Sequence, residues 1–254
     1  AVAVVQSGDG ELDEQRRQLL GAGGSLGGAK PKAVIRIDDD EWVIKFFDGE
    51  PWDHPLVEHA CMTLAQRAGI RVAQTRVLRL PGEHALAVRR FDRQGSTRLH
   101  AVSASTLLRA ATAQGEEPQY GYPHLARRLR AMGNVQRLDE DLHDLFRRMV
   151  FNILIDNTDD HEKNHALLMT DSGEYILSPA FDVLPSGQAL GYQQMRVGAA
   201  GADATLDNAL SQCAQFGLKR PEAVAQLRQV CAVVQGWQAH FASVGVTVAD
   251  IESL

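Results

Sequence analysis

The sequence predicts a two-lobed α+β fold, in which a β-rich N-terminal lobe precedes a helical C-terminal lobe. Strand-like runs are concentrated before about residue 95. Helical periodicity dominates from about residue 103 onward. The 254 residues are enough for one large domain or two small lobes. We place the two lobes at residues 1–95 and 96–254.

A glycine-rich segment and a β-hairpin form the first half of the predicted N-terminal lobe. The segment GAGGSLGGAKPK, at 21–32, follows a short helical run at 11–20. AVIRI (33–37) and EWVIKFF (41–47) then predict two strands, joined by a turn at DDD. A loop rich in glycine therefore lies beside a strand hairpin.

One helix and a second hairpin complete this lobe. The apolar residues between Pro55 and Gly69 fall on one helical face, and Gly69 is a suitable C-cap. RVAQTRVLRL (71–80) and HALAVRRF (84–91) predict two further strands across a PGE turn. The lobe is therefore expected to be a mostly antiparallel sheet with one inserted helix.

The second lobe is organised around one long helix from about Asp139 to Asp156, whose apolar residues share a single face. The polar stretch NTDDHEKN follows it directly. HALLMT and GEYILSP then predict a short hairpin across a DSG turn, followed by AFDVLP. The tail from about 221 to 240 is again helical.

The net charge and the cysteine content indicate which ligands and which cellular compartment we expect. The net charge is −6, so we expect no direct nucleic-acid binding, which normally brings a basic excess. The three cysteines have neither metal-ligand nor disulfide-framework spacing, which favours a reducing cytoplasmic location. We expect no membrane association, because no apolar run approaches the roughly 18 residues of a span. The start also lacks the pattern of a signal peptide.

The polar stretch contains HEKNH, which matches the zinc pattern H-E-x-x-H. Such a site needs both His161 and His165 on one helix. The helical signal ends before the motif, and Asn157 and Asp159 are poor residues for a helix interior. A structural role, with both histidines bonding within the loop, is therefore favoured over zinc.

The same stretch also fits phosphoryl transfer, which needs positioning and charge neutralisation more than covalent chemistry. A glycine-rich loop lets backbone N–H groups approach phosphates. Lys45 lies at the end of the second predicted strand, and the next helix carries Glu58, although Glu50 and Glu83 are nearby in sequence. Asp159 and the later Asp182 supply carboxylates. The ordered set is more specific than any member alone.

The motifs depart from common nucleotide-binding patterns. The glycine loop is not a Walker A motif, because Ala29 replaces the second glycine and Pro31 replaces the Ser or Thr after Lys30. It also fails G-x-G-x-x-G, and the HRD triplet of protein kinases is absent.

Five motifs in order resemble the HipA family of bacterial toxin kinases. They are GGSLGGAKPKAV, WVIKFF, ALAVRRFDR, NTDDHEKNHALL and SPAFDVLP, and they span about Ser25 to Pro185. The resemblance implies a protein-kinase-like fold and a serine/threonine protein kinase that uses ATP and Mg²⁺. It also implies persistence as the biological context.

The resemblance assigns roles to residues in each motif. Asp159 would be the catalytic base, with Lys163 and His161 as further catalytic-loop residues. Asn164 and Asp182 would carry Mg²⁺, and Ser25 would be an autophosphorylation site that inactivates the enzyme. The residues implied in nucleotide binding are Lys45, Glu58, Gly27, Gly28 and Lys32, together with Arg89 and Phe91 of a hinge facing adenine.

Partners also follow from the resemblance. The expected protein substrate is an aminoacyl-tRNA synthetase or another translation protein, and the expected partner is a HipB-like DNA-binding antitoxin. Two alternatives stay open. One is a kinase of a small molecule, and the other is a catalytically silent ATP-binding module that sequesters a partner.

Overall fold

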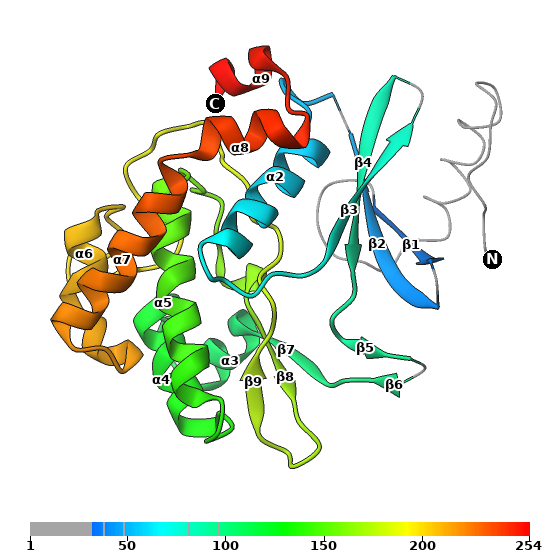
Figure 1. Ribbon diagram of the computed structural model, residues 1–254. Coiled ribbons are helices and arrows are strands. Elements are labelled where there is room, and N and C mark those ends of the chain that lie inside the picture. The colour runs from blue at the N-terminus through cyan, green and yellow to red at the C-terminus, as the bar shows by residue number, and fades with distance from the viewer. Residues whose placement is uncertain (1–31, 38, 48, 81, 96) are drawn as a thin grey trace.

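The computed structural model of the chain describes residues 32–37, 39–47, 49–80, 82–95 and 97–254. The predicted helix at 11–20 lies outside the described residues, as does most of the glycine-rich segment, including Ser25, Gly27 and Gly28. A twisted antiparallel sheet forms one side of the molecule and a group of helices forms the other (Figure 1). The described part therefore has the predicted two-part α+β arrangement.

The sheet has four strands in the order β1-β2-β4-β3. Their bounds are β1 Lys32–Ile37, β2 Asp40–Phe46, β3 Thr75–Leu80 and β4 Glu83–Arg89. All three pairings are antiparallel, so both predicted hairpins are confirmed. Trp42, Ile44 and Phe46 alternate into a small cluster on one face of the sheet. Lys45, which is opposite Leu86, lies on the other face.

The third strand is shorter than the sequence predicted. It begins at Thr75, because the residues before it cross to the helical part. The backbone N–H of Arg71 donates to the Asp144 carboxylate at 3.1 Å, and Val72 forms an isolated parallel bridge with Ala180. These long-range contacts satisfy backbone groups that a longer strand would have paired within the sheet.

Helix α2, His54–Arg67, covers the Lys45 face of the sheet. Asp53 caps its N-terminus by accepting from the Leu56 N–H at 3.1 Å, and Pro55 lies in the first turn. After the helix, Gly69 adopts φ +78°, which glycine tolerates without steric cost. Glu58 is buried near the start of this helix.

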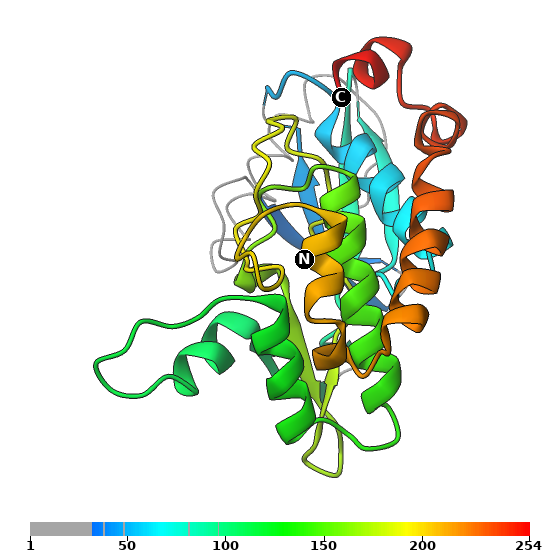
Figure 2. The same cartoon turned by 90° about the vertical axis from the view of Figure 1, so that its left-hand side faces the viewer.

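The helical part is built around α5, Leu138–Leu154, as the sequence predicted. Its buried apolar face includes Leu142, Phe146 and Met149. Figure 2 shows α3 and the segment after it extending away from the helical body. The other helices are α3 Ala104–Ala110, α4 Tyr122–Met132, α6 Leu206–Ser211, α7 Arg220–Val234, α8 Trp237–Val244 and α9 Val248–Ser253. Two short 3₁₀ helices are η1 Glu162–Asn164 and η2 Cys213–Phe216.

The predicted short hairpin is part of a three-stranded sheet, β7-β8-β9. Its strands are β7 Ala101–Ser103, β8 Ala166–Met169 and β9 Tyr175–Leu177. The sequence did not predict β7, because three residues carry no periodic signal and their partner strand is far along the chain. A further two-stranded ribbon comprises β5 Arg93–Gln94 and β6 Thr97–Arg98.

Helix α8, the last helix before α9, packs along α2 (Figure 1). His240 of α8 contacts Thr63 Oγ1 through Nε2 at 2.9 Å and Arg67 Nη1 through Nδ1 at 3.0 Å. Helix α8 therefore contacts the predicted N-terminal lobe, and the lobe division near residue 95 stays a prediction.

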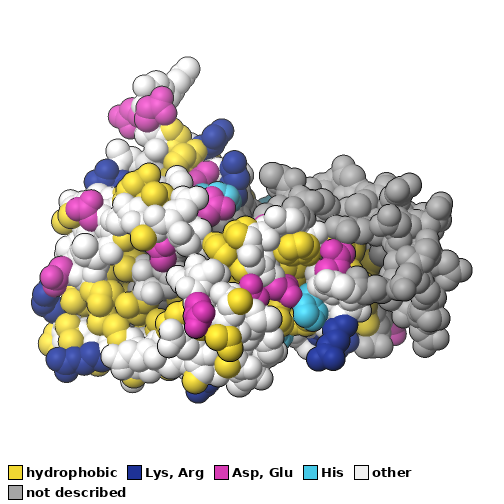
Figure 3. All heavy atoms as spheres, turned by 90° about the horizontal axis from the view of Figure 1, so that it is seen from above, with side chains coloured by type: hydrophobic (Ala, Val, Ile, Leu, Met, Phe, Trp, Pro, Cys, Tyr) yellow, Lys and Arg dark blue, Asp and Glu magenta, His cyan; other side chains and the backbone are white. Residues whose placement is uncertain are grey.

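Seen from above Figure 1, acidic and basic side chains of the described residues are interspersed with apolar ones (Figure 3). In the part of the chain that the structure describes, no helix combines the length and the apolar character that crossing a membrane requires.

The contact between α8 and α2 predicts a pH-dependent stability. Arg67 must donate to Nδ1 of His240, which requires a neutral imidazole. Burial, and then the Arg67 guanidinium, lower the pKa of His240 in the folded state; His59 of α2 is the other nearby titrating group. The unfolded chain therefore binds more protons, so stability is full above about pH 6.5 and falls as the pH drops below it.

We expect the melting temperature to fall between pH 7.5 and pH 5.5, and to fall by about 2 °C less in His240→Gln. Thermal unfolding of both proteins at both pH values measures the difference. Replacing His240 also removes its lowering effect on the pKa of His59, which changes the pH dependence in the same direction. Identical pH dependence of the two proteins would therefore contradict this account of the contact.

Candidate active site

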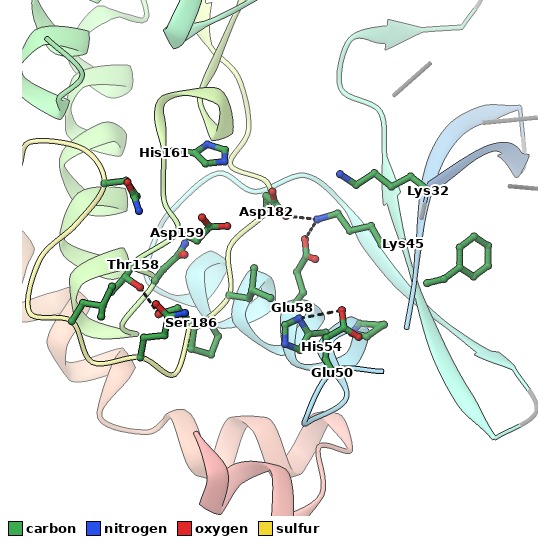
Figure 4. Close-up of a pocket in the computed structure, with 18 residues that line it drawn as sticks. Lys32, Lys45, Glu50, His54, Glu58, Thr158, Asp159, His161, Asp182 and Ser186 are labelled. Carbon is green, nitrogen blue, oxygen red and sulfur yellow. Dashed lines mark hydrogen bonds and ion pairs between the residues drawn. The ribbon is translucent and has the colours of Figure 1, made fainter. Parts of the chain in front are cut away.

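The described residues enclose a cavity of about 560 Å³ between the four-stranded sheet and the helical part. Its walls come from β1, β2, α2, the polar loop after α5, and the segment that follows Asp182. Figure 4 shows Lys32, Lys45, Asp159, His161 and Asp182 arranged around this cavity. Residues predicted from separate motifs therefore meet in one place.

Lys45 is held between two carboxylates. Its Nζ donates to Glu58 Oε1 at 2.5 Å and to Asp182 Oδ1 at 2.6 Å (Figure 4). The three side chains come from β2, α2 and the segment after β9. The Glu58 side chain is 5% exposed and that of Lys45 is 16% exposed, so water screens this pair only weakly.

The electrostatics keep this group ionised. Burial alone would lower the pKa of Lys45, but Glu58 and Asp182 outweigh burial and raise it. Burial acts to raise the pKa of Asp182, yet the Lys45 ammonium holds it below its usual value, with Lys32 and His161 acting in the same direction. The cavity therefore presents a fixed cation beside an ionised carboxylate near neutral pH.

The local backbone at Asp182 is unusual. Asp182 has φ +60°, a left-handed conformation that non-glycine residues rarely adopt. Such residues cost on the order of 1–3 kcal/mol and persist where the surrounding structure holds them. Here the bond to Lys45 holds the side chain, and Phe181 packs against Phe91 with ring centroids 5.3 Å apart.

The loop from Asn157 to His165 has some side chains that line the cavity and others that are buried or exposed to solvent. Asp159 and His161 line the cavity, whereas Lys163 is exposed to solvent. Asn164 is 8% exposed and its Nδ2 donates to the Asp159 carbonyl at 3.4 Å. Neither Lys163 nor Asn164 is among the described residues that line the main cavity.

The zinc interpretation lacks its helix. His161 and His165 both have extended backbone and flank the 3₁₀ helix η1. His161 faces the cavity, while His165 is buried and contacts Asp160 Oδ1 at 3.0 Å. Within the described ranges, no three or more His, Cys, Asp or Glu side chains are grouped to hold a metal ion. The two imidazoles therefore lie in different environments and do not face a common metal position.

The predicted hinge lies at the end of β4. The Arg89 side chain points outward and pairs with Asp40 at 2.7 Å. The Phe91 ring packs on Phe181, and the N–H of Arg90 donates to the Glu41 carbonyl at 2.9 Å. Adenine contacts by Arg89 and Phe91 stay a prediction.

The sequence did not predict the wall of the cavity beyond Asp159. Ser186 lines it, and its Oγ lies 2.5 Å from Thr158 Oγ1 and donates to the Asp156 carbonyl at 2.8 Å. Asp156 also accepts from the Ala189 N–H at 2.7 Å through its carboxylate. These contacts join segments about thirty residues apart and have no local sequence signal. They fix the segment after Asp182 beside the loop.

Known proteins share both the sequence pattern and the fold. The family model "HipA-like C-terminal domain" matches residues 24–237. A curated protein of Sinorhizobium fredii, named "Putative kinase Y4dM", is 30% identical over 157 residues. That match covers 56% of this chain and 37% of the relative, so the chain spans well under two thirds of the relative's length.

Two solved structures have a similar fold. One is a chain of the Shewanella oneidensis MR-1 toxin–antitoxin complex of HipA, HipB and operator DNA, with a TM-score of 0.71 and 18% identity. It is matched over 100% of this chain and 70% of its own. The other is the Helicobacter pylori proinflammatory kinase CtkA, with a TM-score of 0.62, 14% identity, and coverage of 90% and 86%.

These likenesses confirm the predicted two-lobed, protein-kinase-like fold. The family model covers most of the sequence, including the strand of Lys45, the loop of Asp159 and the segment of Asp182. The chain belongs to the family of HipA-like C-terminal domains.

Proposed function

We propose that this chain is an ATP- and Mg²⁺-dependent kinase that phosphorylates serine or threonine in a protein substrate. One observation carries the proposal: Lys45, fixed between Glu58 and Asp182, faces the same cavity as Asp159. Phosphoryl transfer depends on positioning and charge stabilisation, and these four side chains supply both.

Lys45 would bind phosphate oxygens of ATP. Its ammonium stays charged because two carboxylates surround it, and the Glu58 contact aims it into the cavity. Lys32 lies opposite Lys45 on the neighbouring strand and lines the same cavity, so it would add a second cation for the nucleotide. Gly27 and Gly28, which precede this strand, are proposed to contact the phosphates through backbone N–H groups.

Asp159 would accept the hydrogen bond of the attacking hydroxyl and orient it. It is exposed to the cavity, whereas its neighbours Thr158 and Asp160 are buried. His161 also faces the cavity and would support the loop or the phosphates. Lys163 is an exposed residue of the same loop and would neutralise charge on the transferring phosphoryl group from the solvent side.

A magnesium ion at Asp182 and Asn164 is part of the proposal, and the chemistry of these two side chains supports it. Asp182 is an ionised carboxylate beside the cavity, and Asn164 contacts the carbonyl of Asp159 through its amide nitrogen. Carboxylate and amide oxygens are ligands that Mg²⁺ accepts together with substrate phosphates. Asp182 and Asn164 would hold the ion, which neutralises phosphate charge when bound.

The substrate and partners are also proposals. Following the family resemblance, we propose a translation protein such as an aminoacyl-tRNA synthetase as substrate, and a HipB-like antitoxin as partner. The similar fold of a chain in the HipA–HipB–DNA complex supports the antitoxin proposal. Ser25, outside the described residues, is the proposed autophosphorylation site. Arg89 and Phe91 are proposed to flank the adenine site.

Asp159→Asn is expected to abolish phosphoryl transfer while leaving nucleotide binding within about twofold, because the substitution removes the base and keeps the shape. Intact-mass measurement after incubation with Mg²⁺ and ATP should show one added phosphoryl group on the wild type only. Peptide mapping should place that group on Ser25, and Ser25→Ala should lack it. Equal phosphorylation of Asp159→Asn would sink the proposed role of Asp159.

Glu58→Gln tests the lysine pair. The substitution removes one of the two anions that hold Lys45 and leaves a buried amide in its place. A charge-assisted hydrogen bond contributes roughly 1.5–3 kcal/mol, so kcat/KM for ATP should fall about 10- to 100-fold. Initial rates against ATP concentration provide the measurement.

Glu252→Gln is the matched control, because Glu252 lies exposed on α9. It should retain the wild-type kcat/KM. If Glu58→Gln also kept wild-type values, the contact with Lys45 would not serve nucleotide use.

A further inference from the structure

Asp159 and Asp160 are neighbours that point into different surroundings. Asp159 lines the main cavity, whereas Asp160 is 2% exposed and lies on the inner side of the loop. The proposed function uses only Asp159. A buried carboxylate beside the proposed base therefore calls for its own physical account, because burying a charge is costly unless it is well hydrogen-bonded.

Both oxygens of Asp160 are occupied by buried donors. The Tyr122 hydroxyl donates to Oδ2, and His165 Nε2 lies 3.0 Å from Oδ1. Tyr122 is 0% exposed and His165 is 3% exposed, and their rings meet edge to face with centroids 5.2 Å apart. Water therefore has little access to this group, and these bonds hold more firmly than equivalent bonds at the surface.

The network continues back to the start of the loop. Asn152 of α5 donates through Nδ2 to the Tyr122 hydroxyl at 3.0 Å. Asn157, the first residue of the loop, donates through Nδ2 to Asn152 Oδ1 at 3.1 Å. Asn152 and Asn157 are 3% and 1% exposed. A continuous chain of buried bonds therefore runs from Asn157 through α5 and α4 to Asp160 and His165.

The geometry of this network brackets Asp159. The loop is tied down at Asn157 on one side, and at Asp160 and His165 on the other. Its supports are rigid: Tyr122 begins α4, its backbone N–H donates to the Arg196 carbonyl at 3.0 Å, and Asn152 lies within α5. Asp159 is left as the exposed residue between fixed points.

We propose that Asp160 is a positioning residue, which with Tyr122 and His165 fixes the loop so that Asp159 presents its carboxylate to the acceptor hydroxyl. The inference rests on the proposed function. Misplacing a reacting group by about 1 Å can cost roughly a hundredfold in rate, so a buried anchor next to the base has a direct effect on catalysis.

Asp160→Asn tests the anchor with little change of shape. An amide has one acceptor oxygen, so either Tyr122 or His165 loses its acceptor. We expect kcat for phosphoryl transfer to fall about 10- to 100-fold, while KM for ATP stays within about twofold. Tyr122→Phe should give the same pattern, and the double variant should be no slower than Asp160→Asn, because both act through one network.

Asn208→Asp is the control for a simple loss of stability. Asn208 is also a buried polar side chain, 4% exposed, but its amide nitrogen donates to the Gly201 and Asp203 carbonyls, outside the loop. It should lower the melting temperature while keeping kcat close to that of the wild type. A fall in kcat that follows melting temperature across both variants would overturn the positioning role.

Amide hydrogen exchange separates this inference from the proposed function. Faster exchange in Asp160→Asn should be confined to 157–165, and Asn208→Asp should leave that segment protected. If the wild type transferred no phosphoryl group at all, the proposed function would be refuted. The hydrogen-exchange comparison would then test only whether Asp160 anchors the loop. Unchanged exchange at 157–165, or a wild-type kcat in Asp160→Asn, overturns the inference.

Discussion

The contact of Lys45 with Glu58 and Asp182 is the interaction on which the arrangement of the site depends. It joins a strand, a helix and an irregular segment, and its partners are 13 and 137 residues from Lys45 along the chain. Removing one partner of a buried ion pair leaves a charge uncompensated, which is strongly destabilising. The sheet, α2 and the segment of Asp182 must therefore keep their relative positions for the cavity to exist.

The supports of this contact explain features of the fold that otherwise look irregular. The chain before β3 lies outside the sheet and pairs with the segment leading to Asp182. The Ala180 N–H donates to the Arg71 carbonyl at 2.7 Å, and the Ala73 N–H donates to the Ala180 carbonyl at 2.8 Å. Arg148 of α5 donates to the Ser178 carbonyl at 2.6 Å and so holds the same segment against that helix. On its far side α2 is held by α8 through His240. The early end of β3 is thus part of how Asp182 is positioned.

Local pattern was sufficient for the elements whose burial is periodic. The alternation around Lys45 predicted β2, and the apolar face of α5 predicted that helix within two residues at each end. Pattern failed where long-range contacts decide the structure, as at β7 and at residues 71–74. The ordered motifs predicted that Lys45, Glu58, Asp159 and Asp182 belong to one site, and the structure brings them together. The motifs did not predict that Ser186 lines the cavity, because its contacts depend on the fold and have no local sequence signal.

The pair Asp159–Asp160 shows why chemistry cannot be assigned from residue type. The two side chains are identical and adjacent, yet one faces a cavity with Lys45 and the other accepts from buried Tyr122 and His165. Environment, not identity, separates a carboxylate available to a substrate from one committed to structure. The separation depends on residues that no loop motif contains, because Tyr122 and Asn152 lie on helices that precede the loop. The conformation of this loop is therefore specified as much by the helices beneath it as by its own sequence.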